Sequence, residues 1–241
     1  MGAIQRLFLK KWHIKCIIVK YKSIDQFFLK HSKHKILTYC HIKKDAVFLN
    51  GKLLFEISAE DFSGFSKAIY QKLDVLYPKF FKMDNLSKIA FLASEIVLNQ
   101  TDISSEEKKT ALIFSNRASS LDTDRKFQQS ISAKDAYFPS PAVFVYTLPN
   151  ICMGEICIRH KLFAENSFFI FERFNASHLQ TNAAYLLNTK KADKALCGWV
   201  DFDGENYEAF LYLVARDGLW PHETGEIERL YDDNYRIKTG T

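Results

Sequence analysis

Apolar runs typical of buried strands alternate with amphipathic helix patterns along most of this chain, and this alternation limits the possible folds more than any other feature. The run at 167–171 is almost wholly apolar, as in a buried strand. At 175–189 the apolar residues recur three and four positions apart, which is the period of a helix with one buried face. The alternation predicts an α/β sheet with helices on its faces. Further strands are expected at 110–115, 194–200 and 207–215, and further helices at 62–76, 84–98, 125–131 and 151–161.

A β-hairpin is predicted near the start of the chain. Apolar runs at 47–49 and 53–55 flank Asn50-Gly51, a pair that readily adopts the positive φ angles of a two-residue turn. Before it we expect one or two strands and a helix at 24–31. We therefore divide the chain into a basic N-terminal extension with a hairpin, residues 1–60, and a main domain, residues 61–241. The segment from residue 220 is polar and acidic, and we expect it to be only partly ordered.

Positive charge is concentrated at the N-terminus. Residues 1–44 contain eleven lysines and arginines and one aspartate, whereas the whole chain of 241 residues has a net charge of +5. Such a segment attracts an acidic protein, nucleic acid or an anionic membrane surface, or is simply a solvated edge. It lacks the interleaved arginine and aromatic residues of known nucleic-acid modules, so we expect no nucleic-acid binding.

Cysteine usage and hydropathy indicate a cytoplasmic protein. The five cysteines, at positions 16, 40, 152, 157 and 197, are odd in number and lack a CxxC spacing. They are typical of reduced core residues, and we expect neither a metal nor a cofactor. No apolar run reaches the roughly 18 residues that cross a bilayer, so no transmembrane segment is expected.

The segment 148–173 carries the most specific pattern. Leu148-Pro149-Asn150 opens a short helix, a turn follows at 164–167, and the apolar strand then leads to Arg173, twenty residues before Asp193. Together with the strand at 112–114, this order of features resembles the β-ketoacyl synthase family of the thiolase superfold, over roughly 62–216. The resemblance implies an α/β thiolase-like half-fold, the N-terminal domain of a synthase. It would have a mixed sheet with helices on both faces plus the N-terminal basic strand and hairpin.

In this family the strand delivers a nucleophilic cysteine to a helix N-terminus, where the macrodipole stabilises the thiolate. The resemblance places Arg173 at that position, with Glu172 adjacent. Arginine keeps its proton up to a pH above about 12 and cannot attack a thioester. The two catalytic histidines of the family come from its second half, for which we expect no counterpart here. The site therefore has no predicted catalytic residue.

Two other cysteines are candidate substitutes for the missing nucleophile. Cys152 and Cys157 lie on the short helix, and Cys157 is three residues from His160; a thiol–histidine pair is conceivable, but two core thiols are the favoured interpretation. A structural role is favoured for His178. The resemblance makes Phe168, Phe169 and Phe171, and with them His178, candidates for a cavity wall or subunit interface.

The leading hypothesis is a non-catalytic partner similar to the chain-length factors that pair with active synthases in fatty acid, polyketide or aryl-polyene-type biosynthesis. The resemblance implies a heterodimer with a full-length synthase, or a homodimer, because a half-fold leaves apolar surface to be covered. Acyl carrier protein would dock on basic residues such as Lys10, Lys11 and Lys15. One alternative is an active acyl-thioester condensing or transferring enzyme. The other is a homodimeric protein that binds nucleic acid or membrane through the basic segment.

Overall fold

The computed structural model describes residues 34–100, 109–132 and 139–233, and within them one eight-stranded sheet organises the chain. The strand order is β3-β2-β1-β7-β6-β4-β5, and the short β8 pairs with β1. The strands are β1 (Lys35–Lys43), β2 (Ala46–Leu49), β3 (Lys52–Glu56), β4 (Thr110–Asn116), β5 (Asn166–Ile170), β6 (Lys194–Asp203), β7 (Asn206–Ala215) and β8 (Trp220–Pro221). The helices are α2 (Phe62–Lys72), the 3-10 helix η1 (Pro78–Lys82), α3 (Asn85–Leu98), α4 (Leu121–Ile131), α5 (Pro141–Val145), α6 (Ile151–His160), α7 (Ala176–Asn188) and α8 (Thr224–Asp232).

The sheet is mixed, as predicted. β4 runs parallel to both of its neighbours, β5 and β6. All the other pairs are antiparallel. The parallel pairs require crossovers, and α7 makes the one from β5 to β6, whereas a tight turn joins β6 directly to β7.

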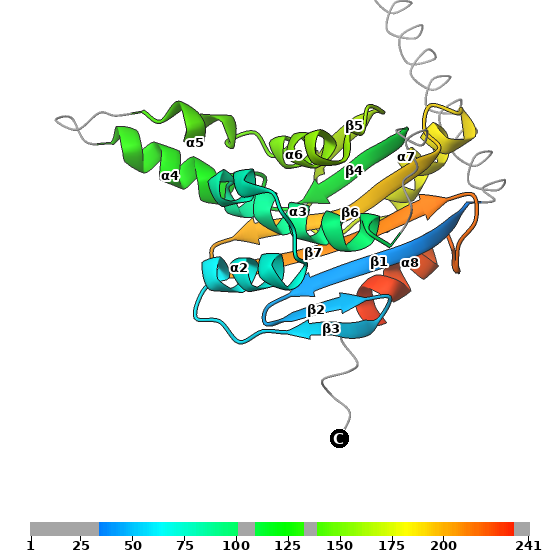
Figure 1. Ribbon diagram of the computed structural model, residues 1–241. Coiled ribbons are helices and arrows are strands. Elements are labelled where there is room, and N and C mark those ends of the chain that lie inside the picture. The colour runs from blue at the N-terminus through cyan, green and yellow to red at the C-terminus, as the bar shows by residue number, and fades with distance from the viewer. Residues whose placement is uncertain (1–33, 101–108, 133–138, 234–241) are drawn as a thin grey trace, which may run out of the picture.

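Helices cover both faces of the sheet, which confirms the predicted layering (Figure 1). On one face α2, α3 and α6 pack in a core that includes Phe91, Leu112 and Leu211. On the other face α7 and α8 pack in a second core that includes Leu179 and Tyr212. Because α3 lies on the sheet between α2 and α6, its residues from Ile89 to Leu98 are all buried.

Local sequence chemistry accounts for the best-predicted elements. The hairpin of β2 and β3 turns at Asn50 and Gly51, whose φ angles are 51° and 77°, and the asparagine side chain accepts a hydrogen bond from the Tyr39 backbone N–H at 2.9 Å. Helix α3 starts after Asp84, whose carboxylate accepts from the Ser87 backbone N–H at 2.9 Å. The hairpin at Asn50-Gly51 and a helix over 84–98 were both predicted from the residues alone.

Several boundaries differ from the predictions. α2 ends at Lys72 rather than 76, and Asp74 follows with a left-handed φ of 51°. α4 begins four residues earlier than expected, and β6 extends to Asp203, three residues beyond its predicted end at residue 200. The expected helix at 24–31 lies outside the described residues.

The polar segment after residue 220 is more regular than predicted. It forms β8 and then α8, which buries only Ile227 and Leu230 against the sheet. Two apolar residues in a mostly charged segment are too weak a pattern to predict a helix. Within the described ranges, no helix is long and apolar enough to cross a membrane.

Candidate functional site

The edge strand β5 is the first part of the candidate site. Among the described strands it pairs only with β4. The Glu165 carbonyl accepts from Leu112 N–H at 3.1 Å, and Phe171 N–H donates to the Asn116 carbonyl at 2.9 Å. Because successive backbone groups alternate sides, residues 166, 168 and 170 direct their N–H and C=O groups to the open side of the sheet. β5 therefore offers an unpaired edge.

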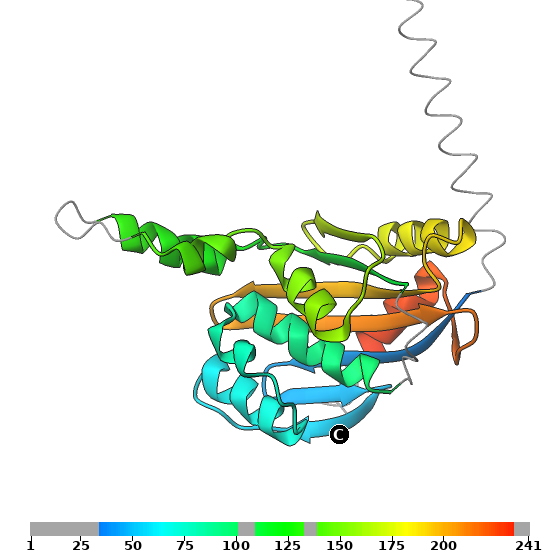
Figure 2. The same ribbon diagram turned by 45° about the horizontal axis from the view of Figure 1, so that its top comes forward.

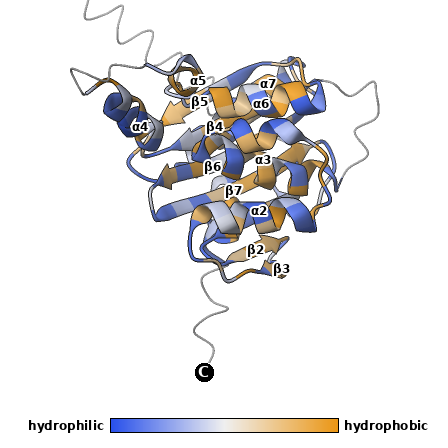
Figure 3. Ribbon diagram, turned by 60° about the vertical axis from the view of Figure 1, so that its left-hand side comes forward, coloured by the Kyte–Doolittle hydropathy of each residue, from blue (hydrophilic) through white to orange (hydrophobic). Residues whose placement is uncertain are grey.

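The side chains of β5 are half-exposed rather than fully buried, in contrast to the predicted buried strand. Ile170 has 51% of its surface exposed, and Figure 3 shows β5 as an apolar strand at the margin of the sheet. The side chains of β5 are half-exposed because β5 is the last strand of the sheet and lacks a neighbour on one side. An apolar edge of this kind is normally covered by another chain or segment.

A small cavity of about 320 Å³ lies beside this edge. Phe168 and Ile170 line it from β5, and Met153 lines it from α6. Pro149 and Asn150, from the turn that precedes α6, complete it together with Asn166. The predicted Leu-Pro-Asn turn and the predicted Phe168 thus meet at one hollow next to the open strand, which two asparagines and four apolar residues line.

Phe169 and Phe171 lie on the α7 side of β5, apart from Phe168. Their rings approach the imidazole of His178 edge-on, with centroids 4.4 Å and 5.0 Å away. Burial lowers the pKa of His178, so the ring is neutral at pH 7. Nε2 of His178 has no hydrogen-bond partner among the described residues. The three side chains form an apolar cluster with no adjacent nucleophile.

Arg173 and Glu172 are exposed in the turn between β5 and α7. α7 begins at Ala176, and Asn175 caps it by accepting from the His178 backbone N–H at 3.0 Å. Arg173 therefore lies two residues before the cap, with its charge in solvent, and neither it nor Glu172 forms an ion pair within the described ranges. No residue of the turn at 171–175 is a cysteine.

The two candidate thiols are poorly suited to attack a thioester. Cys152 is fully buried, and burial raises its pKa well above the ordinary thiol value. Burial also raises the pKa of Cys157. His160 does not activate Cys157: its Nε2 lies 2.7 Å from Oε1 of Glu95, which Arg159 also contacts at 3.1 Å. A thiol that stays protonated is a weak nucleophile.

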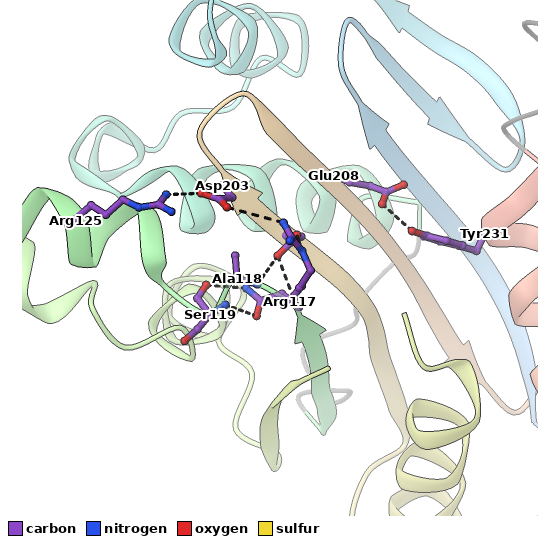
Figure 4. Close-up of polar contacts among 9 residues, drawn as sticks. Arg117, Ala118, Ser119, Arg125, Asp203, Glu208 and Tyr231 are labelled. Atoms are coloured by element: carbon purple, nitrogen blue, oxygen red, sulfur yellow. Dashed lines mark hydrogen bonds and ion pairs between the residues drawn. The ribbon is translucent and has the colours of Figure 1, made fainter. Parts of the chain in front are cut away.

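A network of hydrogen bonds and ion pairs organises the loop after β4 (Figure 4). One carboxylate oxygen of Asp201, on β6, accepts from the backbone N–H groups of Arg117 and Ala118 at 3.1 Å and 2.8 Å. Asp203 forms an ion pair with Arg125 of α4 and lies 3.9 Å from the Arg117 guanidinium. These contacts fix the base of α4 against the end of β6.

Helices α4 and α5 form an arm that reaches away from the sheet (Figure 1, Figure 2). Phe127 of α4 and Phe144 of α5 contact each other with ring centroids 5.3 Å apart. Phe144 nevertheless has 58% of its surface exposed, and Val145 and Leu148 are also exposed. The sequence reasoning missed this apolar surface, although the run 142–145 directly after Pro141 was its visible sign.

The described residues thus form one mixed sheet between two helical layers, and the turn from β5 into α7 carries no cysteine. No protein-family model and no curated protein matches the sequence. Solved structures do match. The ishigamide ketosynthase/chain length factor aligns with a TM-score of 0.54 at 14% identity, over 76% of this chain and 62% of that one.

Two further structures agree. The complex of the ketosynthase ApeO with its chain length factor ApeC from Xenorhabdus doucetiae gives a TM-score of 0.53 at 13% identity, over 84% of this chain and 92% of that chain. The third structure is AntDE with AntF, a type II polyketide synthase acyl-carrier protein in complex with its ketosynthase bound to the hexaketide. It gives a TM-score of 0.50 at 15% identity, over 76% of this chain and 62% of that chain. The chain thus has the ketosynthase and chain-length-factor fold, and spans less than two thirds of the first relative.

Proposed function

We propose that this protein is a non-catalytic β-ketoacyl synthase-like subunit. It pairs with an active ketosynthase in fatty acid, polyketide or aryl-polyene-type biosynthesis and plays the role of a chain length factor. The observation that carries this proposal is the unpaired apolar edge of β5 with the hollow beside it. Structural relatives whose names describe ketosynthase and chain-length-factor pairs support it.

The site chemistry supports a partner rather than a condensing enzyme. The turn after β5 offers Glu172 and Arg173 to solvent where the resemblance implies a thiolate. Cys152 and Cys157 keep their protons, since burial raises both pKa values. Without a thiolate at a helix N-terminus, the part of the chain that the structure describes offers no group suited to carry an acyl intermediate.

Three surfaces contribute to the proposed interface. Backbone groups of residues 166, 168 and 170 can continue the sheet into the partner. Phe168 and Ile170 bring apolar area next to those groups. The α4–α5 arm reaches away from the sheet (Figure 2), and Phe144 on this arm is exposed and adds apolar area. Buried apolar area combined with strand addition gives both affinity and a defined register.

The acyl-carrier-protein contact is a separate part of the proposal. Lys10, Lys11 and Lys15 lie outside the described residues, so it depends on charge alone. An acidic carrier protein would be drawn to the eleven basic residues of the 1–44 segment. Neutralisation by salt would weaken such docking while leaving the β5 interface intact.

The test is co-expression of the chain with candidate ketosynthases, followed by size-exclusion chromatography with light scattering. Two variants of the edge strand, Asn166→Pro and Asn166→Ala, both remove the exposed side chain of Asn166. Asn166→Pro also removes a backbone N–H on the open side, whereas Asn166→Ala keeps it. We expect a one-to-one complex for the wild type and Asn166→Ala, and about tenfold weaker association for Asn166→Pro.

The alternatives predict other results. Self-association through β5 would give a homodimer that Asn166→Pro dissociates and no complex with any of the ketosynthases. Use of a different surface would leave Asn166→Pro and Asn166→Ala equal in binding. Either result would contradict the proposal, provided that thermal melting shows both variants folded.

A further inference from the structure

A second cavity, of about 610 Å³, lies at the opposite end of the parallel strands from the turn that holds Arg173. Its wall is built where β4 and β6 begin and where β7 ends. Because β4 and β5 are parallel, the start of β4 and the end of β5 are at opposite ends of the sheet. This cavity is therefore separate from the proposed interface.

Cations dominate the polar lining of this cavity. Lys109, Lys190, Lys194 and Arg216 line it, against the two carboxylates of Asp193 and Asp217, so the lining has a net charge of +2 when histidine is neutral. Within the described ranges, Lys109, Lys190 and Arg216 form no ion pair with either aspartate or with any other side chain. Three cations that face one hollow without a carboxylate partner favour an anion between them.

Backbone hydrogen bonds position two of these residues, Lys109 and Lys190, in the wall of the cavity. The Lys109 carbonyl accepts from the Asp193 backbone N–H at 2.9 Å, which ties the starts of β4 and β6 together. Lys190 follows the end of α7 with a left-handed φ of 58°, and its N–H donates to the Leu187 carbonyl at 3.2 Å. This turn places Lys190 beside the pair of strand ends.

The remaining wall is apolar or neutral. Leu37, Leu187, Ala192 and Ala215 supply apolar surface, and His34 completes the lining. Burial and then the neighbouring Arg216 lower the pKa of His34, so its ring is uncharged at pH 7. The volume exceeds that of a bare phosphate ion and lies in the range of small-molecule sites.

We propose that this cavity binds a phosphomonoester, with the dianionic phosphate between Lys109, Lys190 and Arg216 and the organic group against Leu37 and Leu187. The net charge of the lining, +2, is equal in size and opposite in sign to that of the dianion. Arginine and lysine donate charge-assisted hydrogen bonds to phosphate oxygens, and arginine can do so with two parallel donors. The inference is independent of the partner assigned to the β5 edge.

Ligand-observed NMR on the full-length protein tests this site with phenyl phosphate, adenosine monophosphate and inorganic phosphate as probes, and with phenol and adenosine as uncharged counterparts. We expect saturable binding of at least one phosphomonoester, tighter than inorganic phosphate, and none of its uncharged counterpart. The double substitution Lys109→Gln with Arg216→Gln should weaken this binding by about tenfold or more. Lys67→Gln, an exposed lysine of α2, is the matched control and should bind as the wild type.

Three results would overturn the assignment. The first is no saturable binding of any of the three phosphates. The second is equal binding of a phosphate and its uncharged counterpart, which would mean that the charge is not recognised. The third is a double variant that melts like the wild type and binds as tightly, which would place the phosphate elsewhere on the protein.

Discussion

His222 makes the stability of this protein sensitive to acid. The side chain is 1% exposed, and neither ring nitrogen has a hydrogen-bond partner among the described residues. Two hydrogen bonds fix the backbone of His222. Its N–H donates to the His34 carbonyl at 3.2 Å, and its carbonyl accepts from the Gln180 side chain at 2.9 Å. Burial and then His34 lower the pKa of His222 from 6.5 to about 3. The folded protein therefore keeps this ring neutral.

The sign and size of the effect follow from linkage. Between about pH 3 and pH 6.5 the unfolded chain binds a proton at His222 that the folded chain does not, so stability falls as the pH falls. Each pH unit well inside that window is worth about 1.4 kcal/mol. Lowering the pH from about 7 to about 5 should thus remove about 2 kcal/mol of unfolding free energy through His222 alone.

His222→Leu separates this contribution from that of other groups. Leucine has a similar volume and does not titrate, and it removes two unpaired ring nitrogens, so the variant should be at least as stable as the wild type at pH 7. Urea unfolding of both proteins at pH 7 and pH 5 measures the difference. The variant should lose about 2 kcal/mol less than the wild type on acidification. Equal losses in the two proteins would refute the assignment of a neutral buried ring.

Four further outcomes are expected. Burial alone would raise the pKa of Glu95, but hydrogen bonds from His160 and Arg159 hold it below its ordinary value. Arg159→Met should therefore lower the urea-derived stability at pH 7 by about 1–3 kcal/mol, with less effect as the pH falls below that ordinary value, and an unchanged urea midpoint would contradict this. Gly198→Ala should cost about 3 kcal/mol or more, because its Cβ would lie 1.9 Å from the Phe210 carbonyl oxygen; a normal melting temperature would show that the strand can shift. Cys40, Cys152 and Cys197 are buried with raised pKa values, so peptide mapping after iodoacetamide should find them unmodified and Cys157 labelled slowly. Incubation with malonyl- or acyl-thioesters should leave no adduct, and a stable thioester on Cys152 or Cys157 would be evidence for an enzyme.

Local patterns predicted the elements of this fold well. The Asn50-Gly51 turn and the start of α3 after Asp84 depend on interactions between residues near in sequence. Such interactions act wherever the segment ends up in space. α8 was missed for the opposite reason: its helical state depends on Ile227 and Leu230 packing on a sheet that is formed by distant strands.

The candidate site was only partly visible in the sequence. The Leu-Pro-Asn turn and the phenylalanines of β5 were recognised, but Phe168 was grouped with Phe169 although they lie on opposite faces of the strand. The separation follows from the two-residue period of a strand. The exposed apolar surface of the α4–α5 arm was not predicted, because the exposure of Phe144 depends on how the whole chain packs.

The sequence alone determined the alternation of strands and helices, the hairpin turn and the absence of a cysteine from the turn after β5. Each of these is a matter of residue type and local spacing. Only the tertiary structure decided that β5 is the last strand of the sheet, that His160 turns to Glu95 rather than to Cys157, and that Lys109, Lys190 and Arg216 surround one hollow. Those facts depend on which distant segments become neighbours, and the packing of the whole chain sets that order.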